Sequence, residues 1–325
     1  MNLHENNTLF KQAVKVAAER MGILDIYIEK DYWVCYALKL IFESKIKEEA
    51  IFKGGTALSK CYKYIERFSE DIDLVILKRE EDTANQLKRK LRDVTNEISA
   101  PFEEVEQEGI SNKKGMIRKI AYNYPKAFKG NYGQVRDTII IEATWLGYFE
   151  PYTKRVLNTY IYDMMLATNQ GDLAKEYYLL PFEVLVLDTT RTVCEKIMSL
   201  VRFSYSSNPI QDLKAKIRHI YDIHQLLKDE NLFEFFNSEA FELMLLKVGN
   251  DDIQSFKNNN KWLASHPKDA LIFKNTEETW YKIRATYQNE FKFLVYGEFP
   301  PEDEVLNTLN QVSKRLKLIK WSINL

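Results

Sequence analysis

Residues 52–58 read Phe-Lys-Gly-Gly-Thr-Ala-Leu, and residues 66–74 read Glu-Arg-Phe-Ser-Glu-Asp-Ile-Asp-Leu. The apolar residues 50–52 predict a short buried strand that ends at the Gly-Gly pair, where the backbone can turn sharply and a ligand can approach it closely. Residues 56–65 have the apolar spacing of a helix. The turn therefore lies at a helix N-terminus, where free N–H groups and the helix dipole favour an anion.

The second segment ends on a strand that carries two acids. Asp71 and Asp73 are two residues apart, so their side chains leave the same face of the strand. Neighbouring carboxylates repel each other unless a cation relieves the repulsion. Magnesium beside an anion site is what phosphoryl or nucleotidyl transfer requires. Taken alone, the pair also fits a solvated strand face; the order strand, Gly-Gly-Thr, helix and Asp-x-Asp favours the metal site.

The composition is that of a globular protein. The chain has 325 residues, of which 45% are hydrophobic and 29% charged, and this length is sufficient for one large or two ordinary domains. The formal net charge is −1, which excludes a general electrostatic attraction to nucleic acid. A nucleic-acid partner would therefore need a local basic patch.

The cysteines and the distribution of apolar residues bear on the compartment. Cys35, Cys61 and Cys194 are far apart and match no metal or redox spacing. The N-terminal residues 1–8 are polar, and no uncharged run approaches the length of a membrane span. We therefore expect a cytoplasmic protein with no membrane partner.

The middle of the chain predicts further strands. Residues 102–108 and 115–124 resemble paired strands, and residues 136–146 form the clearest central strand. Glu142 is the only charge in that central run, and a buried carboxylate needs a partner. It is either a third acid of the metal site or the partner of a nearby lysine or arginine. Residues 122–132 interleave aromatic side chains with lysines, which fits either a binding surface for a single-stranded RNA end or a packed hairpin loop.

From Pro181 onward the apolar spacing is helical almost throughout. It predicts helices over residues 182–203, 210–228, 232–249, 276–293 and 302–317. The amphipathic stripe of the last helix either caps the bundle or docks a partner. We predict two domains, an α/β domain over residues 1–175 and a helical domain over residues 176–325 that completes the cleft.

Two polar groups lie on the predicted helices of the second half. Lys196 follows Glu195 on a helix whose other face is apolar, and Lys214, Arg218 and Asp222 form one stripe at i, i+4 spacing. On spacing alone, the stripe is typical of a solvated face with a weak Arg–Asp pair.

Three of these motifs resemble those of a known family. Residues 53–58 with residues 67–74 resemble the first motif of the AbiEii/AbiGii toxin family, within the DNA polymerase β-like nucleotidyltransferase superfamily. Residues 195–196 resemble its second motif, and residues 214–223 a later one. The resemblance implies an α+β fold: a nucleotidyltransferase-fold domain, with a small mixed sheet and flanking helices, followed by a helical C-terminal domain.

The resemblance also implies roles for individual residues. The catalytic residues would be Asp71, Asp73, Lys196 and Asp222, of which Lys196 contacts the triphosphate and Asp222 orients the acceptor or acts as general base. The residues themselves predict the rest of the site. Nucleotide binding would use Lys53, Gly54, Gly55, Thr56 and Ser69 at the glycine turn, together with Lys196 from the resemblance. The metal ligands would be Asp71 and Asp73, joined by Glu142 in the first of its two interpretations.

One position departs from the family pattern. His219 stands where the family usually has an aspartate, so the proton acceptor is either Asp222 alone or His219 and Asp222 together. A packed, hydrogen-bonded histidine is the third interpretation.

The implied reaction is transfer of a nucleoside monophosphate from an NTP to an acceptor, with magnesium as cofactor and release of pyrophosphate. By the resemblance, the protein is the toxin of a toxin–antitoxin or phage-defence system, its acceptor is a tRNA 3′ end or a protein side chain, and a cognate antitoxin is its partner. Two alternatives remain: a non-catalytic nucleotide-binding module and a small-molecule nucleotidyltransferase of the antibiotic-modifying type.

Overall fold

The computed structural model describes residues 1–133, 135–147 and 149–325 and divides into two compact units. The first, called here the sheet unit, comprises Met1–Lys63, Phe68–Trp145 and Tyr152–Val186. The second, the helical unit, comprises Tyr64–Arg67, Leu146–Pro151 and Leu187–Leu325. The short segment 64–67 therefore belongs to the helical unit, although the sequence on both sides of it belongs to the sheet unit.

The sheet unit contains a seven-stranded mixed sheet in the order β3-β4-β5-β2-β1-β7-β6. Its strands are β1 (Ala50–Lys53), β2 (Ile72–Ile76), β3 (Glu103–Val105), β4 (Ile117–Asn123), β5 (Ile139–Thr144), β6 (Tyr152–Leu157) and β7 (Phe182–Leu187). β1 runs antiparallel to β2 and parallel to β7, whereas β2 runs parallel to β5, which is antiparallel to β4. The α+β fold with a mixed sheet is thus confirmed.

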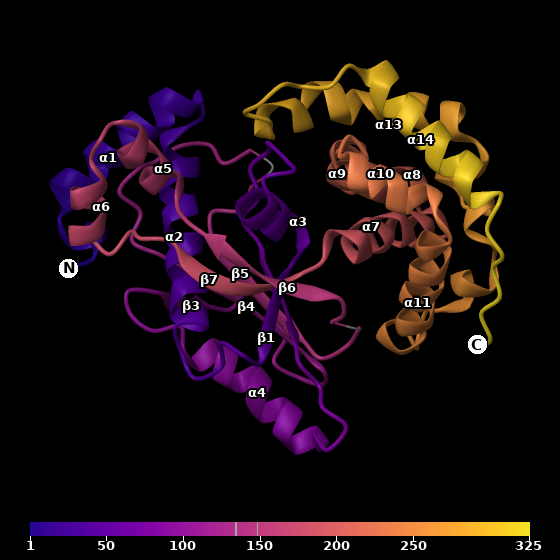
Figure 1. Cartoon of the computed structure of the whole chain (residues 1–325), viewed down its shortest axis with the longest axis horizontal. Coiled ribbons are helices and arrows are strands. Elements are labelled where there is room, and N and C mark those ends of the chain that lie inside the picture. Colours follow the sequence, from indigo (N-terminus) through magenta and orange to yellow (C-terminus); the bar gives the residue numbers. More distant parts are fainter. Residues whose placement is uncertain (134, 148) are drawn as a thin grey trace. The chain divides into compact units, whose positions relative to one another are not determined.

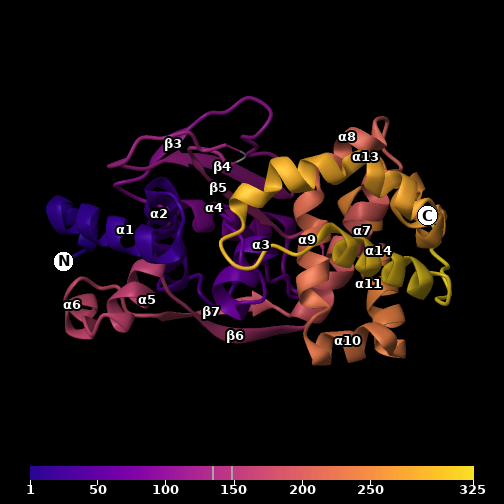
Figure 2. The same ribbon diagram turned by 90° about the horizontal axis from the view of Figure 1, so that it is seen from above.

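Helices flank this sheet (Figures 1 and 2). α1 (Asn7–Met21), α2 (Asp25–Phe42), α5 (Tyr160–Ala167) and α6 (Gly171–Glu176) pack on one another. α4 (Ala84–Asn96) lies on β2, β4 and β5 and buries Leu87, Leu91 and Val94. α3 (Gly54–Ala57) follows β1 directly and continues as a π-helical turn over Leu58–Tyr62.

The helical unit is built around α7 (Thr189–Ser204), which packs on α8 (Pro209–Ala215), α9 (Ile217–Leu226), α10 (Glu230–Asn237), α11 (Glu239–Ser255) and α12 (Leu271–Lys274). α13 (Thr276–Asn289) and α14 (Glu302–Leu316) complete it (Figure 2). The stripe of α14 faces α9, α12 and α13, so it caps the bundle. Its buried side chains are Val305, Leu309, Val312 and Leu316.

One predicted helix begins later than expected. Residues 182–187 form strand β7 rather than the first turns of a helix over 182–203, and α7 begins at Thr189 behind the N-cap Asp188. Val184 to Leu187 are all buried, and Phe52 of β1 lies opposite Val186. A short, continuously buried apolar run has no period that separates strand from helix, so only its pairing with β1 settles the assignment.

No helix within the described ranges is long and apolar enough to cross a membrane.

Candidate active site

The glycine turn touches the acidic strand. β1 ends at Lys53, and Gly54 begins α3 with a φ of 83°, a left-handed conformation that favours glycine. A Cβ atom on Gly54 would lie 2.5 Å from Oδ2 of Asp73. The missing side chain therefore allows the turn to lie directly against this carboxylate.

Hydroxyl groups tie the turn to the start of the acidic strand. The buried Thr56 donates a hydrogen bond from Oγ1 to the carbonyl of Asp71 at 2.6 Å, and the same oxygen lies 3.0 Å from Oγ of Ser69. In this arrangement, Thr56 and Ser69 fix the backbone that precedes Asp73.

Four charged residues form one row across the sheet. In the register of the strands, Lys53 of β1 lies opposite Asp73 of β2, Asp73 opposite Glu142 of β5, and Glu142 opposite Lys119 of β4. Residues in register project from the same face of a sheet. We call these four residues the charge row.

The charge row lies on the face of the sheet that α4 does not cover. Arg118 donates from Nε to Oγ1 of Thr95 on α4 at 2.7 Å, and the hydroxyl of Tyr122 donates to the Thr95 carbonyl at 3.4 Å. Arg118 and Tyr122 therefore face α4, and Lys119, which lies between them in β4, faces the other way.

The acids of this region influence one another. Burial, together with the negative charges of Asp71 and Glu142, raises the pKa of Asp73 from 3.8 to about 7. Glu142 is ion-paired with Lys119 at 2.7 Å, and Oδ1 of Asp71 lies 3.6 Å from Nη1 of Arg136. Glu142 thus has the lysine partner that one of its two interpretations predicted, and it lies beside Asp73; its role as a metal ligand stays a prediction.

The donor set fits magnesium in its chemistry. Three carboxylates supply the hard oxygen ligands that this ion prefers, and the raised pKa of Asp73 marks a place where a cation would relieve repulsion. Lys119 and Arg136 contact the outer acids Glu142 and Asp71. In the described part of the chain, no three His, Cys, Asp or Glu side chains are grouped to hold a metal ion.

A second polar cluster lies in the helical unit. Asp222 of α9 is fully buried, and it accepts hydrogen bonds from Nε and Nη2 of Arg67 and from Nζ of Lys196 on α7, each at 2.7 Å. Burial alone would raise the pKa of Asp222. The two cations more than reverse this effect, so the pKa of the carboxyl lies well below its ordinary value.

The segment that carries Arg67 is fixed within the same unit. The carbonyl of Glu66 accepts a hydrogen bond from the Tyr296 N–H at 2.9 Å, and Arg67 forms an isolated antiparallel bridge with Val295. Gly297 lies against the Glu66 side chain, where a Cβ atom would be 2.0 Å from its Oε2. These contacts hold Arg67 in place beside Asp222.

His219 lies one turn before Asp222 on α9. Burial and the nearby charges of Lys196 and Lys216 lower the pKa of its imidazole well below the ordinary value, so the ring is neutral at physiological pH. Its Nδ1 is buried and has no hydrogen-bond partner among the residues that the structure describes.

The sequence model described as "Nucleotidyl transferase AbiEii toxin, Type IV TA system" matches residues 37–308. The chain belongs to the AbiEii nucleotidyl transferase toxin family. It is a nucleotidyltransferase, as the resemblance of its motifs implied.

The chain is also similar to solved structures. The AbiEii chain is similar to MenT4, a nucleotidyltransferase toxin from Mycobacterium tuberculosis H37Rv, with 15% sequence identity and a TM-score of 0.46. The match covers 92% of this chain and 98% of the MenT4 chain. No curated protein matches the sequence.

The structure of this AbiEii-family chain also shows two long-range contacts of charged side chains that the sequence does not predict. Arg67 stands inside the first motif, but its partner Asp222 is 155 residues away. Glu29 of α2 accepts hydrogen bonds from the N–H groups of Ala127 and Phe128, so the loop that follows β4 is fastened to α2. Spacing along the chain identifies neither pairing. The three consecutive charged residues at positions 29–31, Glu-Lys-Asp, lie on an otherwise apolar helix, and they are the sequence feature that could have indicated buried charges with distant partners.

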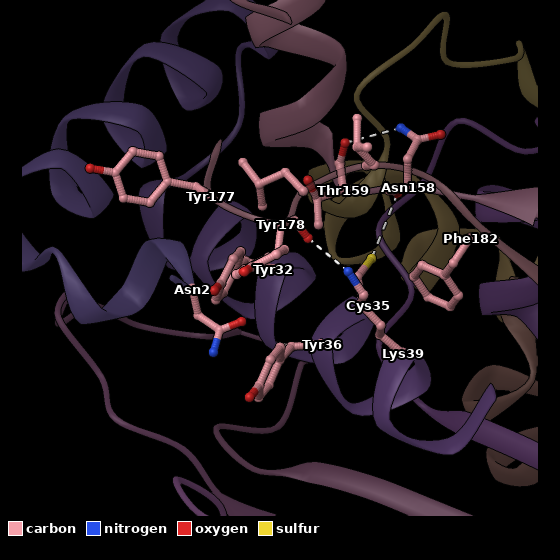
Figure 3. Close-up of a pocket in the computed structure, with 12 residues that line it drawn as sticks. Asn2, Tyr32, Cys35, Tyr36, Lys39, Asn158, Thr159, Tyr177, Tyr178 and Phe182 are labelled. Carbon is pink, nitrogen blue, oxygen red and sulfur yellow. Dashed lines mark hydrogen bonds between the residues drawn. The ribbon is translucent and has the colours of Figure 1, made fainter. Parts of the chain in front are cut away.

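Two pockets of the sheet unit are separate from these residues. One, of about 20 Å³, lies beside α2, where Lys39 donates to the Tyr178 carbonyl at 2.8 Å and the Cys35 thiol faces the Asn158 carbonyl at 3.7 Å (Figure 3). It has room for one water molecule at most. The other, of about 440 Å³, lies beside the start of β7 and includes Phe182. No predicted site residue lines either pocket.

Proposed function

We propose that this AbiEii-family enzyme is a magnesium-dependent nucleotidyltransferase that moves a nucleoside monophosphate from an NTP to an acceptor and releases pyrophosphate. The observation that carries the proposal is the contact between the Gly54 turn and Asp73, within a row that also contains Glu142. A phosphate-binding turn and a set of carboxylates in contact supply both parts that this transfer needs.

On this proposal, Asp71, Asp73 and Glu142 hold the magnesium ion, which when bound neutralises charge on the phosphates and activates the acceptor hydroxyl. The backbone at Gly54 and Gly55 binds the phosphates. Thr56 and Ser69 hold the turn in shape, and Lys53, at the end of β1, adds positive charge.

Lys196 binds the triphosphate, and Asp222 acts mainly through its neighbours. Both oxygens of Asp222 already accept from Arg67 and Lys196, and the carboxylate is shielded from solvent. We therefore assign Asp222 the role of positioning Lys196 and Arg67. His219, one turn before Asp222 on α9, is neutral, and its Nδ1 is equally buried and has no hydrogen-bond partner among the described residues, so we assign it no proton-transfer step.

The biological setting follows from the family. A toxin of a type IV toxin–antitoxin system implies a cognate antitoxin, and we propose that the enzyme acts in the cytoplasm, in growth control or phage defence. The proposed acceptor is a tRNA 3′ end or a protein side chain.

Radiolabelled transfer tests the proposal. Each of the four α-³²P-labelled NTPs is incubated with the enzyme and magnesium in the presence of total tRNA, lysate protein or an aminoglycoside. We expect label in the tRNA or protein pool and none with Asp73→Asn. Label in the aminoglycoside pool would establish the small-molecule alternative. Magnesium-dependent NTP binding without label in any pool would establish a non-catalytic module.

A further inference from the structure

A buried lysine holds the backbone at Arg136, whose side chain is ion-paired with Asp71. Lys30 of α2 is fully buried, and its Nζ donates to the carbonyl of Arg136 and, at 2.9 Å, to that of Thr138. A buried ammonium group stays in place only while its donors are satisfied. The backbone at Arg136 is therefore pinned to α2, immediately before β5, and its guanidinium lies 3.6 Å from Oδ1 of Asp71.

Strand pairing places Lys119 beside Glu142. Lys119 and Glu142 lie directly opposite each other in the antiparallel pair β4–β5, and their charged groups are 2.7 Å apart. Their side chains are 34% and 32% exposed, and that of Arg136 is 49% exposed. Both bases can therefore leave their acids without opening the core.

Arg136 and Lys119 form ion pairs with the two outer acids of the proposed metal site. Asp71 carries Arg136 and Glu142 carries Lys119, while Asp73 lies between these acids. A divalent ion bound by the three acids would compete with both bases for carboxylate oxygens. This explains why the described residues contain suitable acids but no preformed three-acid group.

We propose that Arg136 and Lys119 are exchangeable counter-cations that hold Asp71 and Glu142 until magnesium arrives, and that the displaced Arg136 then binds the phosphates of the NTP. This inference rests on the proposed function. It assigns a nucleotide-binding role to Arg136 and makes metal binding and nucleotide binding mutually reinforcing. An arginine released beside a metal-bound triphosphate meets the anion that its planar guanidinium recognises best.

Metal affinity is the first test. Mn²⁺ binding is followed by electron paramagnetic resonance without nucleotide. Since a partly exposed ion pair is weak, we expect Arg136→Gln and Lys119→Gln each to tighten Mn²⁺ binding about two- to fivefold. The matched control is Lys126→Gln, which removes a lysine from the loop before β5 that pairs with Asp137 instead, and we expect no change. Unchanged or weaker Mn²⁺ binding in Arg136→Gln would overturn the exchange.

A double-mutant cycle separates exchange from general electrostatics. Binding of whichever of ATP, GTP, CTP and UTP binds best is measured in EDTA. Asp71→Asn releases Arg136 without metal, so we expect tighter nucleotide binding in this variant, and we expect Arg136→Gln to cancel most of that gain. Lys126→Gln should leave it intact. Additive effects of Asp71→Asn and Arg136→Gln would refute the role of Arg136.

The two proposals fail in different ways. A folded protein that binds neither Mn²⁺ nor any NTP overturns the proposed function and this inference with it. A protein that binds both and transfers label, but shows an additive cycle, overturns only the inference. Circular dichroism of every variant establishes that it is folded, and Arg136→Lys, which keeps the charge, should restore part of the nucleotide affinity.

Discussion

At the scale of single residues, Asp73 is a carboxyl whose pKa is strongly raised by burial and by the neighbouring acids. Its raised pKa, about 7, means that the folded protein holds a proton there which the unfolded chain loses near pH 4. The stability that this protonation contributes is fully present below about pH 4, is lost progressively as the pH rises from 4 to 7, and is absent above pH 7. Burial of the ionised carboxylate, together with repulsion from Asp71 and Glu142, therefore weakens the metal-free enzyme most in alkaline solution.

Asp73→Asn should remove this pH dependence. In EDTA, we expect the variant to have a higher free energy of unfolding than the wild type at pH 8 and to approach the wild type at pH 5, because Asp73 is then protonated. Urea denaturation at pH 5, 6, 7 and 8 measures the difference. Magnesium should stabilise the wild type at pH 8 and leave the variant unchanged. A difference that is equal at all four pH values would show that Asp73 titrates normally.

Loss of the buried Asp222 should strongly destabilise the helical unit. Asp222→Ala leaves the cations Arg67 and Lys196 facing each other in a buried site, which typically lowers the free energy of unfolding by about 3–5 kcal/mol. Urea denaturation measures the loss. His219→Gln, one turn away on α9 and outside any ion pair, is the control and should cost less than about 1 kcal/mol. Equal losses in both variants would contradict the role given to Asp222.

At the scale of elements, the turn between β1 and α3 depends on glycine for two separate reasons. Gly54→Ala would introduce strain from a φ of 83° and a contact of 2.5 Å with Asp73. Gly22, at the end of α1, has a similar φ of 68° but no atom within 4 Å of an added Cβ. The two glycines therefore separate backbone strain from crowding of the acid.

We expect Gly54→Ala to abolish label transfer and to weaken Mn²⁺ binding at least tenfold, because Asp73 must move. Gly22→Ala should cost about 1 kcal/mol of stability and leave both activities intact. Transfer assays and Mn²⁺ titrations on the two variants measure this contrast. Full activity of Gly54→Ala would show that the contact between the turn and Asp73 is not needed.

Helix α2 carries consecutive buried charges, of which Asp31 anchors the end of the α3 segment. Its carboxylate accepts from Lys60 at 2.6 Å and from the Tyr160 N–H at 2.8 Å. Asp31→Leu strands Lys60 in the core and should lower the free energy of unfolding by about 3–5 kcal/mol, whereas Asp31→Leu with Lys60→Met should recover most of that loss. Thermal and urea denaturation of both proteins measure the recovery. A double variant no more stable than Asp31→Leu would show that the Tyr160 contact is the important one.

At the scale of the whole molecule, the sequence predicted what short-range spacing encodes. The order strand, turn, helix, Asp-x-Asp and the run around Glu142 were enough to expect the strands that carry the acids, because period and turn residues act over about ten positions. The mixed sheet was expected from the family resemblance. The partners of Arg67, Glu29 and Lys30 lie about 100 or more residues away. A buried charge implies that it has a partner, but the sequence does not identify which residue that partner is.

Such long-range pairing also makes a prediction about fragments. The helical unit includes Tyr64–Arg67 and Leu146–Pro151, so a fragment of residues 187–325 lacks Arg67 and leaves Asp222 with Lys196 alone. Loss of two hydrogen bonds to a buried carboxylate should lower the stability of α9 by about 3–5 kcal/mol. Amide hydrogen exchange of α9 in the fragment, in the full chain and in full-chain Arg67→Gln measures this loss.

We expect reduced protection of α9 in the fragment and in the variant. The control is α11, which packs on α7 and should remain protected in Arg67→Gln. Equal protection of α9 in all three proteins would show that segment 64–67 contributes nothing to the helical unit, and Asp222 would then need another explanation for its burial.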